Sequence, residues 1–260
     1  MPRVAVGIEY LGTNYVGWQL QAGQRSVQGA VEAALSAVAN GPVRTICAGR
    51  TDAGVHALGQ VVHFDTPAER AARAWVLGAN TRLPPDIALT WAREMPPDFH
   101  ARFGAVSRTY HYHILNRSER PALAAGRVSW VRRPLEVARM NLAAAHLLGE
   151  HDFNAFRALE CQSRTPVRRV TALAVCREGE RVTIAVTANA FLHHMVRNIA
   201  GLLISVGRGD TGPDFAAEVL ASRDRTRNAA TAPADGLYFV AASYPREFAV
   251  PVGVSAMIPL

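Results

Sequence analysis

Residues 43–64 read Val-Arg-Thr-Ile-Cys-Ala-Gly-Arg-Thr-Asp-Ala-Gly-Val-His-Ala-Leu-Gly-Gln-Val-Val-His-Phe. The apolar runs at the two ends, Val43–Ala48 and Gly59–Phe64, predict two β-strands. Gly49 and Gly54 between them permit tight turns, so the stretch predicts a strand, a loop and a second strand. Asp52 falls in that loop, where a rigid scaffold can present a side chain to a ligand.

Asp52 has the chemistry of a candidate catalytic group. Arg50 is close enough in sequence to pair with it and keep it ionised. An ionised, fixed and partly desolvated carboxylate is what covalent catalysis by aspartate requires. An ordinary surface turn explains the tripeptide of residues 50–52 as well, since most exposed ion pairs are structural and weak.

The elements around this loop predict an N-terminal half of mixed α/β type. Arg3–Tyr10 has the pattern of a strand, and Ser26 is a candidate N-cap for a helix that begins at Val27. A helix over Ala68–Ala79 and a strand over Asp86–Trp91 follow. The order β-α-β-β-α-β resembles a ferredoxin-like split unit, whose open sheet face commonly binds RNA.

A second α/β half is expected from about residue 105. Its predicted elements are strands at Val106–Leu115 and Leu237–Ala241, a hairpin of Arg168–Cys176 with Arg181–Thr187, and helices at Leu135–Leu148, Leu192–Val206 and Pro213–Ala221. We therefore expect an N-terminal half at 1–104 with the Asp loop, a C-terminal half at 105–246, and an extended tail at 247–260. The two halves are expected to share a mixed, largely antiparallel sheet.

The composition favours a polyanionic partner. The chain has 260 residues, 28 Lys+Arg against 21 Asp+Glu, and a net charge of +7, and every one of those basic residues is arginine. Arginine binds phosphate through a planar fork of donors, so the excess points to nucleic acid. A GC-rich genome also enriches arginine, but it does not set the sign of the net charge. The 49% hydrophobic content excludes a disordered chain.

Motifs for metals, cofactors and membranes are missing from the sequence. Cys47, Cys161 and Cys176 are widely spaced and form no CxxC pair, which predicts neither a disulfide framework nor a zinc site. There is no Walker A loop, HExxH or GxSxG motif, and no GxGxxG motif opens a strand-to-helix turn. No apolar run is long enough to span a bilayer, and no signal peptide opens the chain. We expect a cytoplasmic protein without membrane, metal or cofactor.

Three further segments offer candidate site residues. Tyr110 beside Arg108 on a strand can stack on a base, although a tyrosine that covers a sheet is common. Arg197 lies off the apolar stripe of its predicted helix and is free to meet a carboxylate or phosphate, or simply to be solvated. The preceding His193 and His194 are expected on successive helix positions, which point apart, so they predict no zinc site. Leu237 can wall a base pocket or belong to the core.

Taken together, these motifs resemble the TruA family of tRNA pseudouridine synthases. The resemblance runs from Tyr10 to about Tyr244, nearly the whole chain. The motifs that carry it, in order, are Tyr10–Thr13, Gly17–Gln19, Ser26–Gln28, Gly49–His56, Gly59–Phe64, Phe99–Phe103, Cys161–Pro166, Phe191–Asn198 and Asp235–Tyr238. Several independent motifs in the right order are far more specific than any one alone.

The resemblance implies a function and a role for each candidate residue. Such enzymes convert uridine to pseudouridine at positions 38, 39 and 40 of the anticodon stem-loop of tRNA, without a cofactor. Asp52 matches the essential aspartate. Arg50 and Arg197 match arginines that hold it and help to extrude the nucleotide, Tyr110 matches the tyrosine that stacks on the target base, and Leu237 matches an apolar pocket residue. Members are homodimers that grip one tRNA with both subunits.

Several alternatives remain open from the sequence. Asp52 could attack C6 of uracil or C1' of the ribose, or act as a base at C2'. The arginines that contact phosphate are not located, and Arg25, Arg82, Arg108, Arg164 and Arg168 are candidates. A non-catalytic RNA-binding protein would not need Asp52, and a hydrolase of the glycosidase type would need a second positioned carboxylate.

Overall fold

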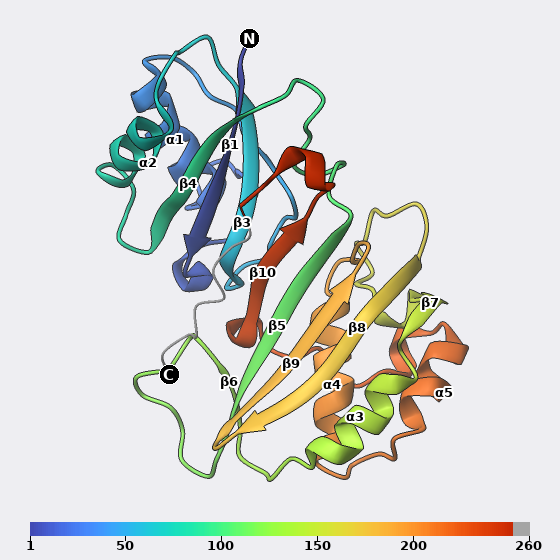
Figure 1. The fold of residues 1–260 in the computed structure, drawn as a ribbon. Coiled ribbons are helices and arrows are strands. Elements are labelled where there is room, and N and C mark those ends of the chain that lie inside the picture. Colours follow the sequence, from blue (N-terminus) through green and yellow to red (C-terminus); the bar gives the residue numbers. More distant parts are fainter. Residues whose placement is uncertain (252–260) are drawn as a thin grey trace. The chain divides into compact units, whose positions relative to one another are not determined.

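The computed structural model describes residues 1–251, which form two compact units (Figure 1). One unit contains Met1–Arg108 and the residues from Tyr238 on, and the other contains Thr109–Leu237. We call them the first and the second unit. The sequence placed the last strand with the C-terminal half, but from Tyr238 on that strand belongs to the first unit. The reason is its pairing, because Tyr238 and Phe239 lie parallel to His56 and Ala57.

The first unit is built on a sheet in the order β4-β1-β3-β10, with β2 also paired to β3. β1 pairs antiparallel with both β3 and β4. The bounds of its strands and helices are β1 Arg3–Tyr10, α1 Val27–Ala39, β2 Ile46–Cys47, β3 His56–Asp65, α2 Ala72–Asn80, β4 Ile87–Met95 and β10 Leu237–Ser243. The strand predicted at Arg3–Tyr10 is confirmed residue for residue.

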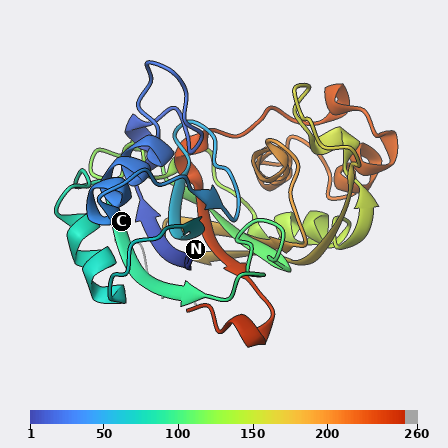
Figure 2. The same ribbon diagram turned by 90° about the horizontal axis from the view of Figure 1, so that it is seen from above.

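Both helices of the first unit cover one face of its strands (Figure 2). Ser26 caps α1 as predicted, since its hydroxyl accepts a hydrogen bond of 3.2 Å from the amide of Gly29. α2 packs on α1 and on β4, and Trp75 on α2 meets Phe64 of β3 edge-on at 5.2 Å between ring centroids. Both rings are almost fully buried, so this contact is part of the core of the unit.

The second unit contains strands in the order β5-β9-β8-β7, with β6 parallel to β5. β8 pairs antiparallel with β7 and β9. The bounds are β5 Ser107–Asn116, β6 Ser129–Val131, α3 Val137–Ala145, β7 Gly149–Asp152, β8 Val167–Glu178, β9 Arg181–Ala188, α4 Met195–Gly207 and α5 Phe215–Ser222. β9 has one buried face, because Val182, Ile184 and Val186 are buried while their neighbours are half-buried.

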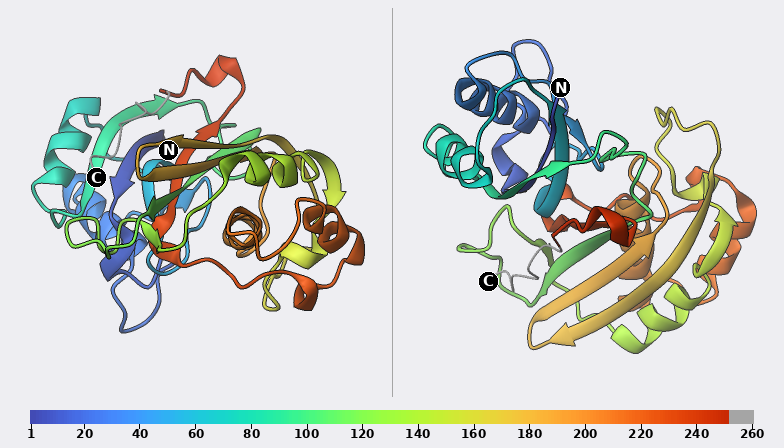
Figure 3. Two further views of the ribbon diagram at one scale, coloured as in Figure 1. Left: turned by 90° about the horizontal axis from the view of Figure 1, so that it is seen from below. Right: turned by 45° about the horizontal axis from the view of Figure 1, so that its top comes forward.

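α4 is the central helix of the second unit. All of its residues except Arg197 are buried, and it packs on α3. Figure 3 shows it end-on, on the same side of the strands as α3. Short 3₁₀-helices also occur in the chain, at Gly12–Asn14, Asn154–Phe156, Arg225–Arg227, Ala234–Gly236 and Arg246–Phe248.

The mixed α/β class with mostly antiparallel strands is confirmed, and several details differ from expectation. α4 begins at Met195 rather than Leu192, because His194 adopts a left-handed φ of 61° that a helix cannot contain. The short strands β6 and β7 were not predicted. β7 reads Gly-Glu-His-Asp and has no apolar alternation to signal a strand. In residues 1–251, no helix has the length and apolar character needed to cross a membrane.

The predicted tail at 247–260 is described only as far as residue 251. Phe248 packs on Phe99 at 5.3 Å between ring centroids, and Arg93 donates a hydrogen bond to the carbonyl of Ala249. These first tail residues are therefore docked on the first unit rather than extended from it. Residues 252–260 lie outside the described part of the chain.

His63 makes the stability of the first unit depend on pH. Its ring, almost fully buried on β3, accepts a 3.1 Å hydrogen bond from the amide of Ala101 through Nδ1. Burial, with help from the nearby His100 and Arg3, lowers the pKa of His63 to about 4, against the partial opposition of Asp65. The unfolded chain takes up this proton near pH 6.5, so stability is full above that value and falls as the pH drops towards 4.

We expect the titration of His63 to lower the free energy of unfolding by about 2 kcal/mol as the pH falls from 7 to 5. Urea unfolding of the protein and of His63→Gln measures it, since glutamine keeps a hydrogen-bond acceptor but does not titrate in this range. The variant should lose about 2 kcal/mol less than the parent on acidification. Equal losses in the two proteins would show that His63 is not the titrating group.

Candidate active site

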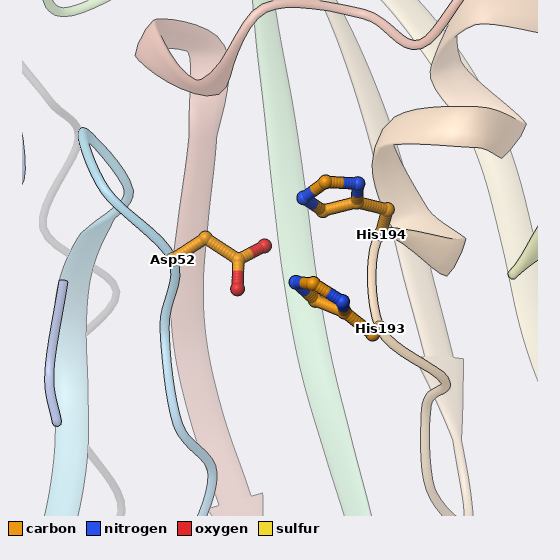
Figure 4. A group of neighbouring side chains, drawn as sticks. All are labelled: Asp52, His193 and His194. Carbon is orange, nitrogen blue, oxygen red and sulfur yellow. The ribbon is translucent and has the colours of Figure 1, made fainter. Parts of the chain in front are cut away.

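Asp52 lies in the loop of residues 48–55 between β2 and β3, which we call the Asp52 loop (Figure 4). Its side chain is half-buried. The backbone of the loop is held on the neighbouring segment, because the amide of Trp18 donates to the carbonyl of Thr51 at 2.9 Å and Gly17 forms an isolated bridge with Asp52. The loop closes on itself through a 3.1 Å hydrogen bond from the amide of Val55 to the carbonyl of Asp52. Asp52 is thus on a fixed backbone and is not sealed in the core.

Glycine is required at two places around this loop. Gly17 has a φ of +107°, and a Cβ there would lie 2.6 Å from the carbonyl oxygen of Thr51. Gly12 is approached even more closely, since its Cβ would lie 1.9 Å from the carbonyl oxygen of Val55. The backbone of residues 12–17 can pack this tightly on the loop only where side chains are absent.

The sequence suggested that Arg50 pairs with Asp52. In the structure the Arg50 side chain is exposed. An exposed guanidinium is well hydrated, and an ion pair in water contributes only about 0–1 kcal/mol, too little to hold the arginine against its neighbour. Arg50 is therefore accessible to a ligand from solvent.

Tyr110 lies on β5 in the second unit and is 8% exposed. Its ring meets Phe191 edge-on, with the ring centroids 5.0 Å apart. Two residues on, Tyr112 is fully buried and donates a 2.9 Å hydrogen bond to the carbonyl of Pro233. Burial raises the pKa of Tyr112, so that hydroxyl stays protonated and structural. Of the two tyrosines, Tyr110 keeps some exposure.

Arg197 lies in the first turn of α4 with its guanidinium anchored on one side only. Nε donates to the carbonyl of Ala232 at 2.8 Å, and the amide of Ala232 donates back to the carbonyl of Arg197. Among the described residues, its two terminal nitrogens make no hydrogen bond. A guanidinium held in this way presents a fixed fork of donors that suits a carboxylate or a phosphate.

Leu237 begins β10 directly after the turn of Ala234–Gly236 and is 5% exposed. The turn packs closely on the strands beside it, because a Cβ on Gly236 would lie 2.6 Å from the carbonyl oxygen of His113 and 3.0 Å from the ring of Tyr112. This close packing fixes the start of the strand. Leu237 is accordingly a buried residue with a small exposed fraction.

The histidine pair before α4 differs from expectation. His193 and His194 precede the helix instead of lying on it, and their rings are 4.1 Å apart between centroids (Figure 4). The left-handed backbone of His194 turns the two rings towards each other. The argument that helix geometry points the two side chains apart was therefore wrong.

Three of the arginines proposed for phosphate contact already have protein partners. Arg25 pairs with Asp86 and stacks on Tyr15. Arg108 donates hydrogen bonds to the carbonyls of Ala48, Arg102 and Ala105. Arg168 is 8% exposed and donates hydrogen bonds to Ser163 and Thr165. Arg82 and Arg164 are exposed and stay candidates.

The structure thus groups the predicted site residues by unit. Asp52 and Arg50 belong to the first unit, and Tyr110, Arg197 and Leu237 belong to the second. Sequence reasoning missed the polar side chains that support the Asp52 loop, namely Tyr10, which bonds to Thr51, and Gln60, which bonds to Gly49. Each lies on a strand at a position that reads as ordinary core or sheet, so a local pattern carries no signal for them.

Comparison with known proteins relates these features to one family. A family model described as tRNA pseudouridine synthase matches residues 7–104 and 143–245, which include Asp52, Arg197 and Leu237 but not Tyr110. A protein called tRNA pseudouridine synthase A from Methylococcus capsulatus is 56% identical over 95% of this chain and 91% of its own length. Proteins of the same name from Nitrosococcus oceani and Vibrio cholerae are 54% and 55% identical, each over 96% of this chain and over 96% and 94% of their own lengths.

The close approach at Gly17 generates a stability prediction with an internal control. Gly23 also has a positive φ, +71°, but a Cβ there meets nothing within 4 Å. Gly23→Ala should cost about 1 kcal/mol from backbone strain alone. Gly17→Ala should cost about 3 kcal/mol, since it adds a collision with the Thr51 carbonyl to a similar strain. Urea unfolding measures both, and equal costs would contradict tight packing against the loop.

Proposed function

Given that this chain belongs to the tRNA pseudouridine synthase family, we propose that it isomerises uridine to pseudouridine at positions 38, 39 and 40 of the anticodon stem-loop of tRNA. Family membership makes the chain an isomerase that acts on tRNA. The observation that carries the finer proposal is the Asp52 loop, where a half-buried carboxylate stands on a backbone held by close glycine contacts. The positions in tRNA rest on the resemblance of the sequence motifs.

The proposed reaction needs only acid–base and nucleophilic groups. The bond between C1' and N1 breaks, the uracil turns, and a bond between C1' and C5 forms. The proton lost from C5 is balanced by a proton gained at N1, so nothing is oxidised, reduced or hydrolysed. A carboxylate and several guanidinium groups suffice for such chemistry, and we propose that no cofactor takes part.

We assign the essential role to Asp52. As a nucleophile it attacks C6 of the base or C1' of the sugar, and as a base it removes the proton at C2'. All three routes need an accessible carboxylate on a rigid support, because effective attack requires a near-ideal distance and direction. The half-buried side chain and the hydrogen-bonded loop support that role.

We assign the arginines to the extruded nucleotide. Taking a base out of its stack costs a few kcal/mol, which contacts to phosphate and stacking on the protein offset. Arg50 is exposed and so can contact RNA from solvent. Arg197 is anchored through Nε with its terminal nitrogens left for a ligand, which supports a role in holding negative charge in the reaction.

We assign the contacts to the target base to Tyr110 and Leu237. Tyr110 has an aromatic face and a hydroxyl, which suit stacking on uracil and proton transfer. Leu237 would supply an apolar wall. We further propose that the protein works in the cytoplasm as a homodimer whose two subunits bind one tRNA; light scattering would then give twice the mass of one chain.

The decisive experiment uses an unmodified tRNA and Asp52→Asn. Carbodiimide treatment followed by primer extension maps pseudouridine, and we expect new stops at positions 38–40 after incubation with the parent protein. Asp52→Asn should lose at least about 10³-fold in rate, because the amide is neither a base nor a nucleophile, while the affinity for tRNA stays within a few-fold.

Asp98→Asn is the matched control, since Asp98 is an exposed carboxylate of the same unit. It should retain full activity. The absence of new stops with the parent protein would refute the assignment to the anticodon arm. Full activity of Asp52→Asn would show that the reaction does not need the Asp52 carboxylate.

Arg197 offers a second test of the assigned roles. Arg197→Met keeps the length of the side chain but removes its donors, and we expect about 10²-fold slower single turnover. Arg197→Lys keeps the charge but loses the anchored fork, so it should restore little of the rate. Arg132→Met, a change at an exposed arginine of the same unit, should leave the rate unchanged. A lysine variant with parental rate would show that the geometry of the fork is unimportant.

A further inference from the structure

The main-chain pairing between β2 and β3 ends at Ala48, the first residue of the Asp52 loop. Ile46 lies opposite His63 and Cys47 opposite Val62, and the amide of Ala48 still donates to the carbonyl of Val61 at 2.8 Å. The same antiparallel register would place Gly49 opposite Gln60. At this position the side chain of Gln60, rather than its backbone, forms the hydrogen bonds to Gly49.

The carboxamide of Gln60 binds both polar groups of Gly49. Its Nε2 donates to the carbonyl of Gly49 at 2.7 Å, and its Oε1 accepts from the amide of Gly49 at 3.4 Å. Because one planar group meets donor and acceptor of one residue, it fixes the position and the orientation of that backbone. This is the last backbone restraint before Arg50, Thr51 and Asp52.

The other end of this short segment is held by Tyr10. The hydroxyl of Tyr10 lies 2.8 Å from Oγ1 of Thr51, within hydrogen-bond distance. Gln60 and Tyr10 thus hold the Asp52 loop at two points, Gly49 and Thr51. Only Arg50 lies between these two residues of the loop.

These polar groups are closed to water. Gln60 is 0% exposed, Tyr10 is 4% exposed and Thr51 is 6% exposed. Burial raises the pKa of Tyr10 above its ordinary value, so its hydroxyl stays protonated and keeps one hydrogen to donate. A buried polar group that loses its partner costs about 1–3 kcal/mol, so the groups hold each other in one arrangement.

We propose that Gln60 and Tyr10 are positioning residues for the reaction, which hold Gly49 and Thr51 so that the Asp52 carboxylate stands in its reactive place. This inference rests on the proposed role of Asp52. Neither side chain needs to touch the nucleotide. Their effect is transmitted through the backbone, where a displacement of about 1 Å can lower a rate by about 10²-fold.

The test removes single oxygen atoms and leaves the packing unchanged. Tyr10→Phe and Thr51→Val each break the connection at the Thr51 end, and Thr51→Ser keeps the hydroxyl. Tyr244→Phe is the matched control, because Tyr244 of the same unit donates a 2.7 Å hydrogen bond to the carbonyl of Ala101, a residue outside the Asp52 loop. Both phenylalanine variants therefore lose one partly or fully buried hydrogen bond.

We expect Tyr10→Phe and Thr51→Val to slow single turnover by about 10- to 100-fold at saturating tRNA. The dissociation constant for tRNA should change by less than about 3-fold, since the substrate contacts remain. Thr51→Ser should recover most of the rate, and Tyr244→Phe should match the parent. Hydrogen exchange should show faster exchange of the amides of residues 49–55 in Tyr10→Phe than in Tyr244→Phe.

Equal rates and equal exchange in the two phenylalanine variants would overturn the inference, as would a Thr51→Ser variant as slow as Thr51→Val. If Tyr10→Phe does not fold, the two variants of Thr51 decide the matter alone. Failure of the proposed function gives a different result, because the parent protein itself would then form no pseudouridine in tRNA.

Discussion

The organisation of the candidate site depends on where β2 leaves β3. Main-chain hydrogen bonds hold the two strands as far as Ala48, the first residue of the Asp52 loop. A strand that separates from its partner exposes polar backbone groups, and in a core these must find new partners. Here Gln60 supplies them, and Tyr10 extends the restraint to Thr51. The fold thereby converts the end of a β-ladder into a rigid support for one carboxylate. The glycines at 12 and 17 complete it, because they let a neighbouring segment lie directly against the loop.

The abundant arginines serve the fold as much as they serve a polyanionic partner. A carbonyl oxygen is a common acceptor for guanidinium groups in this chain, as seen for Arg3, Arg108, Arg168, Arg177, Arg197 and Arg225. A planar group with five donors on three nitrogens can join several segments at once, whereas lysine carries its three donors on a single nitrogen. Arg108 shows the consequence, because it binds three carbonyls, one of them at the start of the Asp52 loop. The net positive charge therefore overstates the number of arginines free to contact phosphate, and exposed residues such as Arg50 and Arg82 are better candidates than those with carbonyl partners.

Local patterns predicted most helices and strands to within a few residues. Strand β1 and the Ser26 cap follow from contiguous apolar residues and from one hydroxyl, both of which act over a few positions. The start of α4 was missed because the left-handed turn at His194 is not encoded by glycine or asparagine, the usual signals. The membership of β10 in the first unit was also missed. β10 pairs with β3, which is distant along the chain, and a local pattern contains no information on such a pairing.

The sequence by itself determined the α/β class, the position of the Asp52 loop between two strands, and the motifs that relate the chain to its family. These features are encoded by residues next to one another, so they can be read without coordinates. Only the tertiary structure decided which side chains support the loop. Tyr10 reaches Thr51 across 41 positions and Arg108 reaches Ala48 across 60. Such hydrogen bonds form only when folding has brought distant strands together and excluded water from between them, and no spacing of residues along the chain specifies them.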